Sequence, residues 1–293
     1  MAGLPSAKNN DVTPAPAAGA LRFAGLALDQ PRIMGIVNVT PDSFSDGGHY
    51  AETDAAIAHG RRLREEGAAI LDIGGESTRP GAAPLAPEAE MGRVIPVIRA
   101  LAGDGALVSV DTRRAVVMRA AIEAGARIVN DVTALTGDAD SLGVVRDSGA
   151  SVVLMHMLGD PQTMQRDPTY SDVVEDIRAY LTARVAVCRA AGIASERIAV
   201  DPGIGFGKTV EHNLRLLARL DRFLTLDVAL LVGASRKSFI GKLSRGEAAS
   251  ERVSGSVAAA LAAISRGAHI VRVHDVAATR QALAVWQAVE KHG

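Results

Sequence analysis

The sequence has few aromatic residues and a single cysteine. Among 293 residues only 3% are Phe, Trp or Tyr, although 48% are hydrophobic. The core must therefore be packed with Ala, Val, Leu and Ile, as in barrels and doubly wound sheets of the α/β class. Cys188 is the one cysteine, so an internal disulfide is excluded. Its place in the helical pattern LTARVAVCRAAG favours a buried core thiol over a nucleophile.

An excess of either charge is also missing. The chain carries 32 Lys and Arg against 33 Asp and Glu, a net charge of −1. This balance argues against broad binding to nucleic acid or to anionic membranes, since both need a basic field. A small anionic ligand held by a few local cations remains compatible with it.

Long apolar stretches are absent too, because no run approaches the ~20 residues of a membrane span. Residues 1–20 lack the apolar centre of a signal peptide and are rich in Ala, Pro and small polar residues. We expect a disordered tail over 1–20, a single catalytic domain over 21–293, and a cytoplasmic protein.

Eight short apolar runs recur along the chain, and a segment with helical spacing follows each. The runs are 33–37, 69–73, 106–110, 127–129, 151–155, 197–200, 228–232 and 269–273. Near-continuous Val, Ile, Leu and Ala suit parallel strands buried on both faces. Eight β-then-α units predict a (β/α)₈ TIM barrel. A doubly wound sheet is the alternative, and the even spacing of the units favours closure.

Nearly every apolar run ends in polar or ionisable residues. These are Asn38, Asp72, Asp111, Asn130, Asp131, His156, Asp201, Ser235, Arg236, Lys237, Arg272, His274 and Asp275. Barrel enzymes build their sites at the C-terminal ends of the strands. The sequence therefore predicts an active site at this mouth.

Cations at the strand ends indicate an anionic ligand. Arg272 and His274 are two residues apart on a strand, so both point to the same face, and the Arg fork suits phosphate oxygens. An ion pair between Arg272 and Asp275 is the structural alternative. Lys237 and Arg79 add further cations, which suggests a substrate with several negative charges, such as a pyrophosphate.

Hydrogen-bond acceptors at other strand ends indicate a second chemistry. Asp72, Asp111, Asn130 and Asp201 suit a ligand with several N–H groups, such as an aminated heteroaromatic ring. For Asp72, bracing the following glycine loop is an alternative of nearly equal weight.

The stretch DPGIGFGKT, residues 201–209, looks like a nucleotide-binding loop but fails its spacing. A P-loop needs Gly five residues before the Gly of Gly-Lys-Thr, and Pro202 stands there. We interpret the three glycines of 203–207 as permitting close backbone approach and exposing Phe206 as an apolar wall. Lys208 is expected at the surface, at the start of a helix.

Two features bear on metals. His156 has no second His or Cys at ligand spacing, which argues against zinc and favours a hydrogen-bonded histidine at the mouth. The loop NVTPDSFSDGG, residues 38–48, is longer than the usual 2–6-residue connection. Its Asn38, Asp42 and Asp46 are hard oxygen ligands suited to Mg²⁺ together with substrate phosphates.

These stretches carry a family resemblance. In chain order they are GIVNVTPDSFSDGG, DIGGESTRPGA, SVDT, VNDV, MHMLGDPQTMQ, DPGIGFGKT, GASRKSFIG and RVHDV. Together they resemble the dihydropteroate synthase family from about Ile33 to the C-terminus. The resemblance implies a (β/α)₈ barrel that joins 6-hydroxymethyl-7,8-dihydropterin pyrophosphate to p-aminobenzoate. It also implies release of pyrophosphate with Mg²⁺ in folate biosynthesis, a homodimer, and binding of sulfonamides as p-aminobenzoate mimics.

The resemblance also assigns residues. It places around the pterin Asp111, Asn130, Asp201, Lys237, Met155 and Phe206. It gives Mg²⁺ to Asn38, and the pyrophosphate to Arg79, Arg272 and His274. It gives p-aminobenzoate to Thr78, Pro80, Phe206, Ser238, Phe44 and Ser45. The catalytic roles fall to Lys237, Asp46, Asn38 and Arg272.

In the mechanism that the resemblance implies, pyrophosphate leaves first and a pterin-stabilised cation is then attacked by the arylamine. The loop over residues 38–48 closes on the bound substrate, with Gly47 and Gly48 as its hinge, excludes water, and brings Asp46 near the positive charge. The absence of a nucleophile–base pair in the motifs agrees with a reaction that has no covalent enzyme intermediate.

Two other functions compete with this one. A pterin-binding methyltransferase that uses methyltetrahydrofolate and a corrinoid would share the acceptors, but it has no use for TPDSFSDGG, STRPG or SRKS. A degenerate, non-catalytic pterin-binding barrel should have lost Arg272, His274, Lys237 or Asn38, and all four are present. Its only support is the stretch with Leu158 and Asp160, where a polar residue and often Asn are expected. We expect these two residues to affect only local loop packing.

Overall fold

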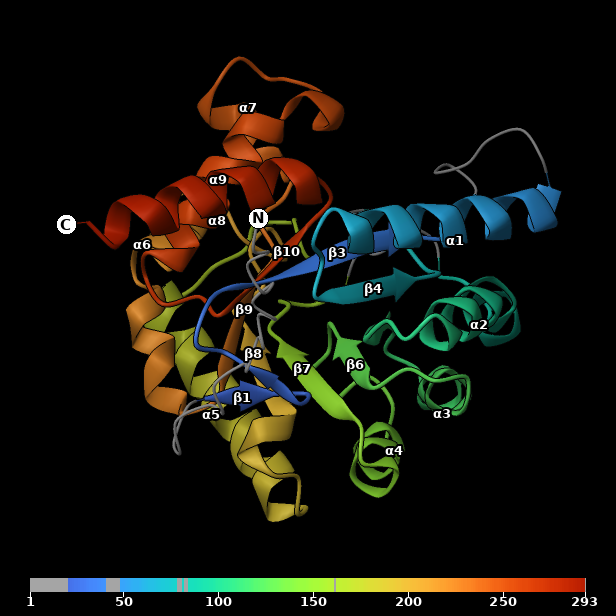
Figure 1. Ribbon diagram of the computed structural model, residues 1–293. Helices are drawn as coiled ribbons and strands as arrows, with labels where there is room; N and C mark the ends of the chain where they lie inside the picture. The colour runs from blue at the N-terminus through green and yellow to red at the C-terminus, as the bar shows by residue number, and fades with distance from the viewer. Residues whose placement is uncertain (1–20, 41–47, 78–80, 82–83, 161, 293) are drawn as a thin grey trace, which may run out of the picture.

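The computed structural model describes residues 21–40, 48–77, 81, 84–160 and 162–292 (Figure 1). Several predictions therefore lie outside the described residues. They concern the tail over 1–20 and the site residues Asp42, Phe44, Ser45, Asp46, Thr78, Arg79 and Pro80.

Eight parallel strands close into a barrel, which confirms the predicted fold class. Their order around the barrel is β10-β3-β4-β5-β6-β7-β8-β9, so the last strand closes on the first by pairing Arg272 with Met34 and Val273 with Gly35. The strands are β3 Arg32–Asn38, β4 Ile70–Gly74, β5 Val108–Asp111, β6 Ile128–Asp131, β7 Ser151–Met155, β8 Ile198–Asp201, β9 Ala229–Val232 and β10 Ile270–Val273. Each corresponds to one of the eight apolar runs.

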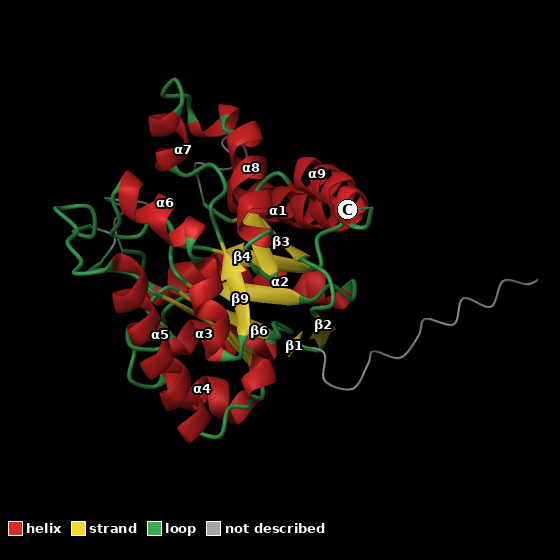
Figure 2. Ribbon diagram, turned by 90° about the vertical axis from the view of Figure 1, so that its left-hand side faces the viewer, coloured by secondary structure: helices red, strands yellow, loops and turns green. Residues whose placement is uncertain are grey.

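Helices surround the barrel and connect successive strands (Figures 1 and 2). Two helix ends show ordinary caps: Asp172 accepts hydrogen bonds from the first-turn amides of α5, and Gly149 ends α4 at a φ of 74°. The α-helices are α1 Gly48–Glu65, α2 Pro87–Gly103, α3 Ala115–Glu123, α4 Ser141–Ser148, α5 Val173–Ala190, α6 Val210–Ala218, α7 Ser238–Leu243, α8 Val253–Ile264 and α9 Val276–Glu290. Short 3₁₀ helices are η2 Ser195–Arg197, η3 Leu220–Leu226 and η4 Ala249–Glu251.

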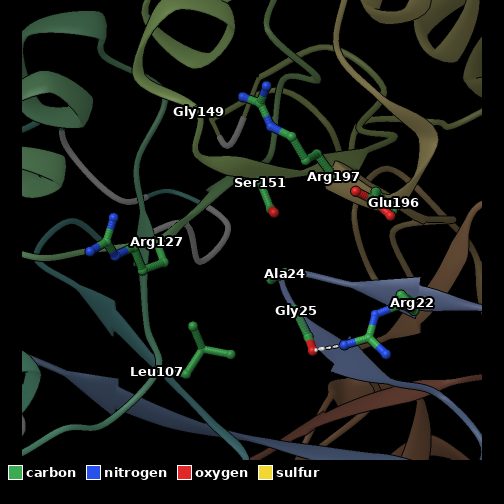
Figure 3. Close-up of a pocket in the computed structure, with 9 residues that line it drawn as sticks. All are labelled: Arg22, Ala24, Gly25, Leu107, Arg127, Gly149, Ser151, Glu196 and Arg197. Carbon is green, nitrogen blue, oxygen red and sulfur yellow. Dashed lines mark hydrogen bonds between the residues drawn. The ribbon is translucent and has the colours of Figure 1, made fainter. Parts of the chain in front are cut away.

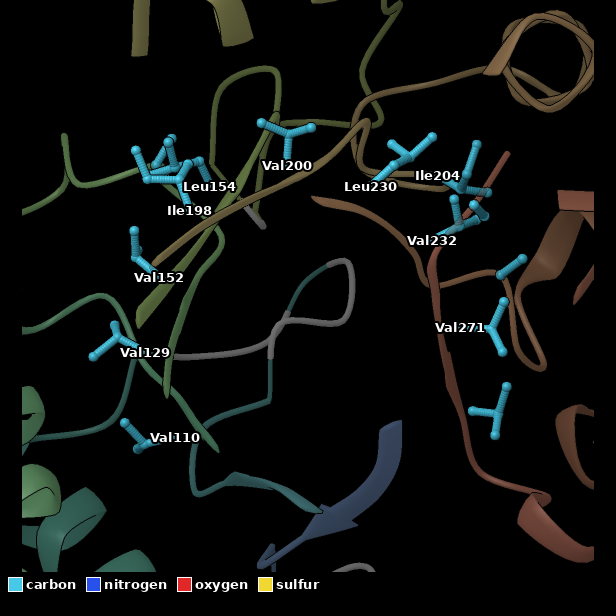
Figure 4. Packing of buried hydrophobic residues seen from close by; sticks show 14 of the residues in the cluster. Val110, Val129, Val152, Leu154, Ile198, Val200, Ile204, Leu230, Val232 and Val271 are labelled. Carbon is cyan, nitrogen blue, oxygen red and sulfur yellow. The ribbon is translucent and has the colours of Figure 1, made fainter. Parts of the chain in front are cut away.

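The strands bury apolar side chains on both faces, as the continuous runs predict. Outward-facing residues such as Val110, Val152 and Val271 pack against the helices (Figure 4). Inward-facing residues form a separate apolar cluster inside the barrel, made of Met34, Ile70, Ile128, Val153, Ala199, Ala229, Leu231 and Ile270. Cys188 is buried on α5, which confirms the core thiol.

A hairpin that the sequence analysis missed closes the N-terminal end of the barrel. Its strands, β1 Arg22–Phe23 and β2 Leu26–Ala27, are antiparallel, and Phe23 is fully buried against the inner apolar cluster. A cavity of about 270 Å³ lies at this end, bordered by the hairpin and by Leu107, Ser151 and Arg197 (Figure 3). Because apolar residues fill the barrel below, polar side chains gather at the opposite, C-terminal end.

None of the described helices is both long and apolar enough to cross a membrane.

Candidate active site

A polar layer lies directly above the apolar interior of the barrel. Side chains two residues apart on a strand share a face, so the residue two positions after each inner apolar residue also points inward. These are Asp72 after Ile70, Asn130 after Ile128, Met155 after Val153, Asp201 after Ala199, Gly233 after Leu231, and Arg272 after Ile270. Four of the polar side chains predicted at the mouth, those of Asp72, Asn130, Asp201 and Arg272, therefore belong to this inward-facing layer.

Arg272 occupies the centre of this layer. Its Nε donates to Asp72 Oδ2 at 2.6 Å, and its Nη2 donates to Asp111 Oδ2 at 2.8 Å. Asp72 has no exposed surface and also accepts a hydrogen bond from Asn130 Nδ2 at 3.0 Å. One buried carboxylate thus orients both the guanidinium and the amide.

Two structural alternatives from the sequence are therefore wrong. Asp72 does not brace the glycine loop, and Arg272 does not pair with Asp275. Asp275 instead binds Arg236 in a bidentate pair, with distances of 2.5 and 3.0 Å. Adjacent residues on a strand point to opposite faces, and Asp275 lies three positions after Arg272, which separates the two side chains.

The predicted partner of Arg272 in an anion site, His274, forms its own contacts. Its Nδ1 lies 3.0 Å from Ser235 Oγ, and its backbone N–H donates to the same oxygen at 3.2 Å. Ser235 is buried and His274 is half-buried. Ser235 thus contacts both the backbone and the imidazole of His274, and the ring contact restrains the imidazole at the end of β10.

Burial and charge set the protonation of the polar layer. Burial raises the pKa of Asp111 to about 7; Arg272 opposes this rise and Asp72 adds to it. Burial also raises the pKa of Asp201, against the effect of Lys237. Burial lowers the pKa of Lys237 to about 8, although Asp201 favours its charged form. Burial thus brings the pKa of Asp111 and the pKa of Lys237 toward neutral pH, a shift that is common at functional sites.

Lys237 and Phe206 are neighbours, as their shared assignment to the pterin requires. The Lys237 Nζ lies 4.5 Å from the centre of the Phe206 ring, within the range of a cation–π contact. The same ammonium donates to the carbonyl oxygen of Ile204. Lys237 is the residue before α7, and Ser238, its exposed first residue, lies next to it in the chain.

The loop after β8 confirms the need for glycine. Gly203 has a φ of +69°, and a Cβ there would lie 1.9 Å from the His156 carbonyl oxygen. Gly207 has a φ of +64°, and a Cβ there would lie 2.6 Å from Leu158 Cβ. Leu158 thus packs directly against this loop, which agrees with a role in local packing.

The prediction for Lys208 is wrong, because its side chain is buried rather than at the surface. Only 4% of Lys208 is exposed, and its Nζ lies 3.1 Å from His156 Nδ1. Burial and the nearby Lys208 charge lower the pKa of His156 to about 3, which favours a neutral ring in contact with the Lys208 amino group. The expected hydrogen-bonded histidine at the mouth is confirmed.

Asn38 and Asp111 approach each other across Gly74. The three residues are paired in register on β3, β4 and β5. A Cβ on Gly74 would lie 3.8 Å from Asn38 Oδ1 and 3.9 Å from Asp111 Oδ2. The missing side chain leaves space between the two oxygens. Within the described part of the chain, no group of three or more His, Cys, Asp or Glu is arranged to hold a metal.

An ionic cluster that the sequence analysis missed joins the described residues Glu76 and Leu85, at the two ends of the segment 76–85. Glu76 accepts a hydrogen bond from the backbone N–H of Leu85 at 2.9 Å and from Arg114 Nη2 at 2.8 Å. Arg114 also donates to the Leu85 carbonyl at 2.6 Å and to the fully buried Glu90. Both ends of the segment are therefore tied together. No local sequence pattern predicted this cluster, because its members come from separate βα units.

Comparison with known proteins identifies the family. The model of pterin-binding enzymes matches residues 34–274. Dihydropteroate synthase of Neisseria meningitidis serogroup B is 52% identical over 269 residues, which covers 90% of this chain and 94% of that protein. The chain belongs to the dihydropteroate synthase family. The resemblance read from the motifs is thus confirmed.

Solved structures of this family superpose closely. Dihydropteroate synthase of Xanthomonas albilineans with 4-aminobenzoic acid has a TM-score of 0.86 and 53% identity, covering 92% of this chain and 97% of that one. The enzyme from the same organism with 7,8-dihydropteroate has a TM-score of 0.82 and 50% identity, covering 90% and 95%. The Yersinia pestis enzyme with a sulfonamide drug has a TM-score of 0.85 and 45% identity, covering 91% and 96%.

Proposed function

We propose that the chain is a dihydropteroate synthase, a transferase of folate biosynthesis. It joins 6-hydroxymethyl-7,8-dihydropterin pyrophosphate to p-aminobenzoate and releases pyrophosphate. The single observation that supports this best is Arg272, held by Asp72 and Asp111 in the polar layer of a barrel that matches structures with 4-aminobenzoic acid and with 7,8-dihydropteroate.

The pterin ring would be held by the acceptors of the polar layer. Asp111, Asn130 and Asp201 supply carboxylate and amide oxygens for ring N–H and exocyclic amine groups. Lys237 supplies an ammonium to the ring, while Met155 and Phe206 supply apolar contacts. Met155 is paired in register with Asp201, which places an apolar and a charged side chain side by side.

The pyrophosphate would be held by Arg272, His274 and Arg79. Two carboxylates fix the plane of the Arg272 guanidinium, and an arginine has five N–H donors, so further donors are available to phosphate oxygens. A guanidinium already oriented by Asp72 loses little side-chain entropy when the anion binds. Asp72 is therefore a positioning residue for the leaving group.

Mg²⁺ is the cofactor that we propose, with Asn38 as its protein ligand. An amide oxygen with a carboxylate beside it across Gly74 suits a hard cation that binds through one or two protein groups plus phosphates. Bound there, Mg²⁺ would supply charge stabilisation to the departing pyrophosphate.

In the reaction, the C–O bond to pyrophosphate breaks and the pterin ring stabilises the resulting cation. The amine nitrogen of p-aminobenzoate then forms the new C–N bond and loses a proton. Lys237 and Arg272 act by stabilising negative charge that develops on the leaving group, the usual large contribution in such sites. Asp46, in the loop over 38–48, would stabilise the positive charge.

p-Aminobenzoate would bind against Phe206 and Ser238, together with Thr78, Pro80, Phe44 and Ser45. The same side of the site would take sulfonamides, which is supported by the complex of the Yersinia pestis relative with a sulfonamide drug. We further propose a cytoplasmic homodimer, as the family resemblance suggests; light scattering of the purified protein tests the dimer.

The deciding experiment is pyrophosphate release by the purified protein with Mg²⁺ and both substrates. Release that requires both the pterin pyrophosphate and p-aminobenzoate is expected. Binding of the pterin pyrophosphate without release would favour the non-catalytic barrel. Methyl transfer from methyltetrahydrofolate to a corrinoid, with no release of pyrophosphate, would favour the methyltransferase.

A further inference from the structure

The backbone of the loop after β8 is held by four side chains from four places in the chain. The carbonyl oxygens of residues 204, 205, 206 and 207 each accept a hydrogen bond from one side chain. The donors, in that order, are Lys237 Nζ, Gln165 Nε2 at 2.7 Å, Lys208 Nζ at 2.8 Å and Tyr170 Oη at 2.8 Å. We call these four side chains the carbonyl cradle. A run of glycines with positive φ has little stiffness of its own, so its shape depends on these contacts.

Lys208 is the most unusual member of the cradle, because its amino group is buried, and burial lowers the pKa of Lys208 well below its ordinary value while the Asp201 charge opposes this shift. Its ammonium contacts the Phe206 carbonyl, His156 Nδ1 and, at 3.4 Å, the His156 carbonyl. Among the described residues no carboxylate lies within ion-pair distance of Lys208, and the carboxylate whose charge favours its protonated form is Asp201. Burying a charge with hydrogen bonds but without a paired carboxylate is costly. A methionine would fill this space at a lower cost in desolvation free energy. The contacts that the Lys208 nitrogen makes therefore account for a lysine at this position.

Lys208 fixes the backbone of Phe206, the residue that forms the apolar wall of the site. Its ammonium binds the carbonyl of Phe206, whose ring lies under the Lys237 ammonium. Behind Lys208, the His156 ring is fixed by Tyr180, with ring centres 5.0 Å apart and perpendicular planes. A continuous chain of contacts therefore runs from Tyr180 through His156 and Lys208 to the Phe206 carbonyl.

We propose that Lys208 is a positioning residue of the synthase: it fixes the Phe206 ring against Lys237, and so sets the affinity for the flat ring substrates. This proposal rests on the proposed function, which puts Phe206 at the contact between pterin and p-aminobenzoate. Lys208 does not touch the reacting atoms. It acts through the carbonyl and ring of Phe206, so its removal changes KM more than kcat.

The test is Lys208→Met, which keeps the unbranched side chain as far as Cε and removes the terminal nitrogen. We expect KM for p-aminobenzoate and the Kd for the pterin pyrophosphate, measured by calorimetry, to rise at least ~10-fold, equivalent to about 1.4 kcal/mol. We expect kcat to fall less than about threefold. In a Phe206→Leu background the same change should add less than about twofold, because residues that act as a unit are not additive.

A matched control is Arg197→Met at the opposite end of the barrel. Arg197, which is half-buried and labelled in Figure 3, also donates to backbone carbonyls, those of Val145 and Ala150, each at 2.6 Å. Its loss should lower Tm without changing KM or Kd. If Lys208→Met behaves in the same way, or raises KM equally in the Phe206→Leu background, Lys208 only stabilises the fold and the proposal is wrong.

If the Lys208→Met variant does not fold, Tyr170→Phe is the variant to measure instead. That change removes one hydroxyl donor from the Gly207 carbonyl and leaves no buried charge. A rise in KM of about threefold that disappears with Phe206→Leu supports the cradle, and an unchanged KM overturns it. A wild-type protein that releases no pyrophosphate would refute the synthase, whereas the Kd for the pterin pyrophosphate in the same variants would still decide the role of Lys208.

Discussion

Replacing Arg272 by Met removes the cation between two carboxylates of the polar layer. Asp72 has no exposed surface, and only 15% of the Asp111 side chain is exposed. Breaking a buried ion pair from one side costs about 3–5 kcal/mol, because it leaves an uncompensated charge. We therefore expect the free energy of unfolding to fall by about that amount, together with loss of pyrophosphate release.

The same change has a pH signature whose sign follows from Asp111. In the wild type Arg272 lowers the pKa of Asp111, which burial raises to about 7; without Arg272 this pKa rises further. An acid whose pKa is raised in the folded state loses stability as pH rises from its unfolded value toward its folded value. The variant therefore continues to lose stability at pH values above those at which the wild-type loss, centred on a pKa of about 7, levels off. The difference between the two should widen from pH 6.5 to pH 8.5.

Urea unfolding followed by circular dichroism at these two pH values measures both effects. A second change, Asp72→Asn in the Arg272→Met background, removes one of the two unpaired buried carboxylates. It should restore about 1–2 kcal/mol of the free energy of unfolding. Arg236→Met is the matched control, because it breaks an Arg–Asp pair whose Arg side chain is 32% exposed, and it should cost about 1 kcal/mol or less. A loss at Arg272 no larger than that of the control, or a loss independent of pH, would refute the reasoning.

Three further predictions test other parts of the site. Lys237→Ala should lower turnover at least ~10²-fold, and near-normal turnover would contradict its role. In the wild type we expect kcat/KM to decline above pH 8, where the Lys237 ammonium loses its proton, and the variant should lack this decline. Gly203→Ala should cost several kcal/mol more in urea unfolding than Gly149→Ala, since both have positive φ but only Gly203 meets a carbonyl oxygen; equal costs would contradict the close approach. Asp46→Ala should lower turnover more than pterin-pyrophosphate affinity by calorimetry, and equal losses would count against a late role for its loop.

The barrel was predictable from the sequence because local signals repeat in it eight times. Each strand is an apolar run short enough to be a strand, and each is buried on both faces, so no register has to be known to recognise it. The hairpin over 22–27 was missed because its two-residue strands carry no periodicity. The hairpin depends on the packing of Phe23 against the inner apolar cluster, which forms only when the barrel has closed.

The site was predictable as a location but not as a set of contacts. Asn38, Asp111, Asn130, Asp201 and Lys237 could be recognised at strand ends, because the ends of parallel strands meet at one mouth. Whether Lys208 faces water or the interior depends on packing against His156, 52 residues away in the chain, and the helix start that follows it suggested the wrong answer. Burial of a long side chain is decided by what other segments place above it.

By itself, the sequence determined the eight βα units, the polar strand ends and, through its motifs, the family, since each depends on residue types within a short window. Only the tertiary structure decided which carboxylates hold Arg272. Asp72 and Asp111 lie 200 and 161 residues before it, and they reach it because closure pairs β10 with β3. An ion pair is set by distances of a few ångströms, and chain closure creates those distances.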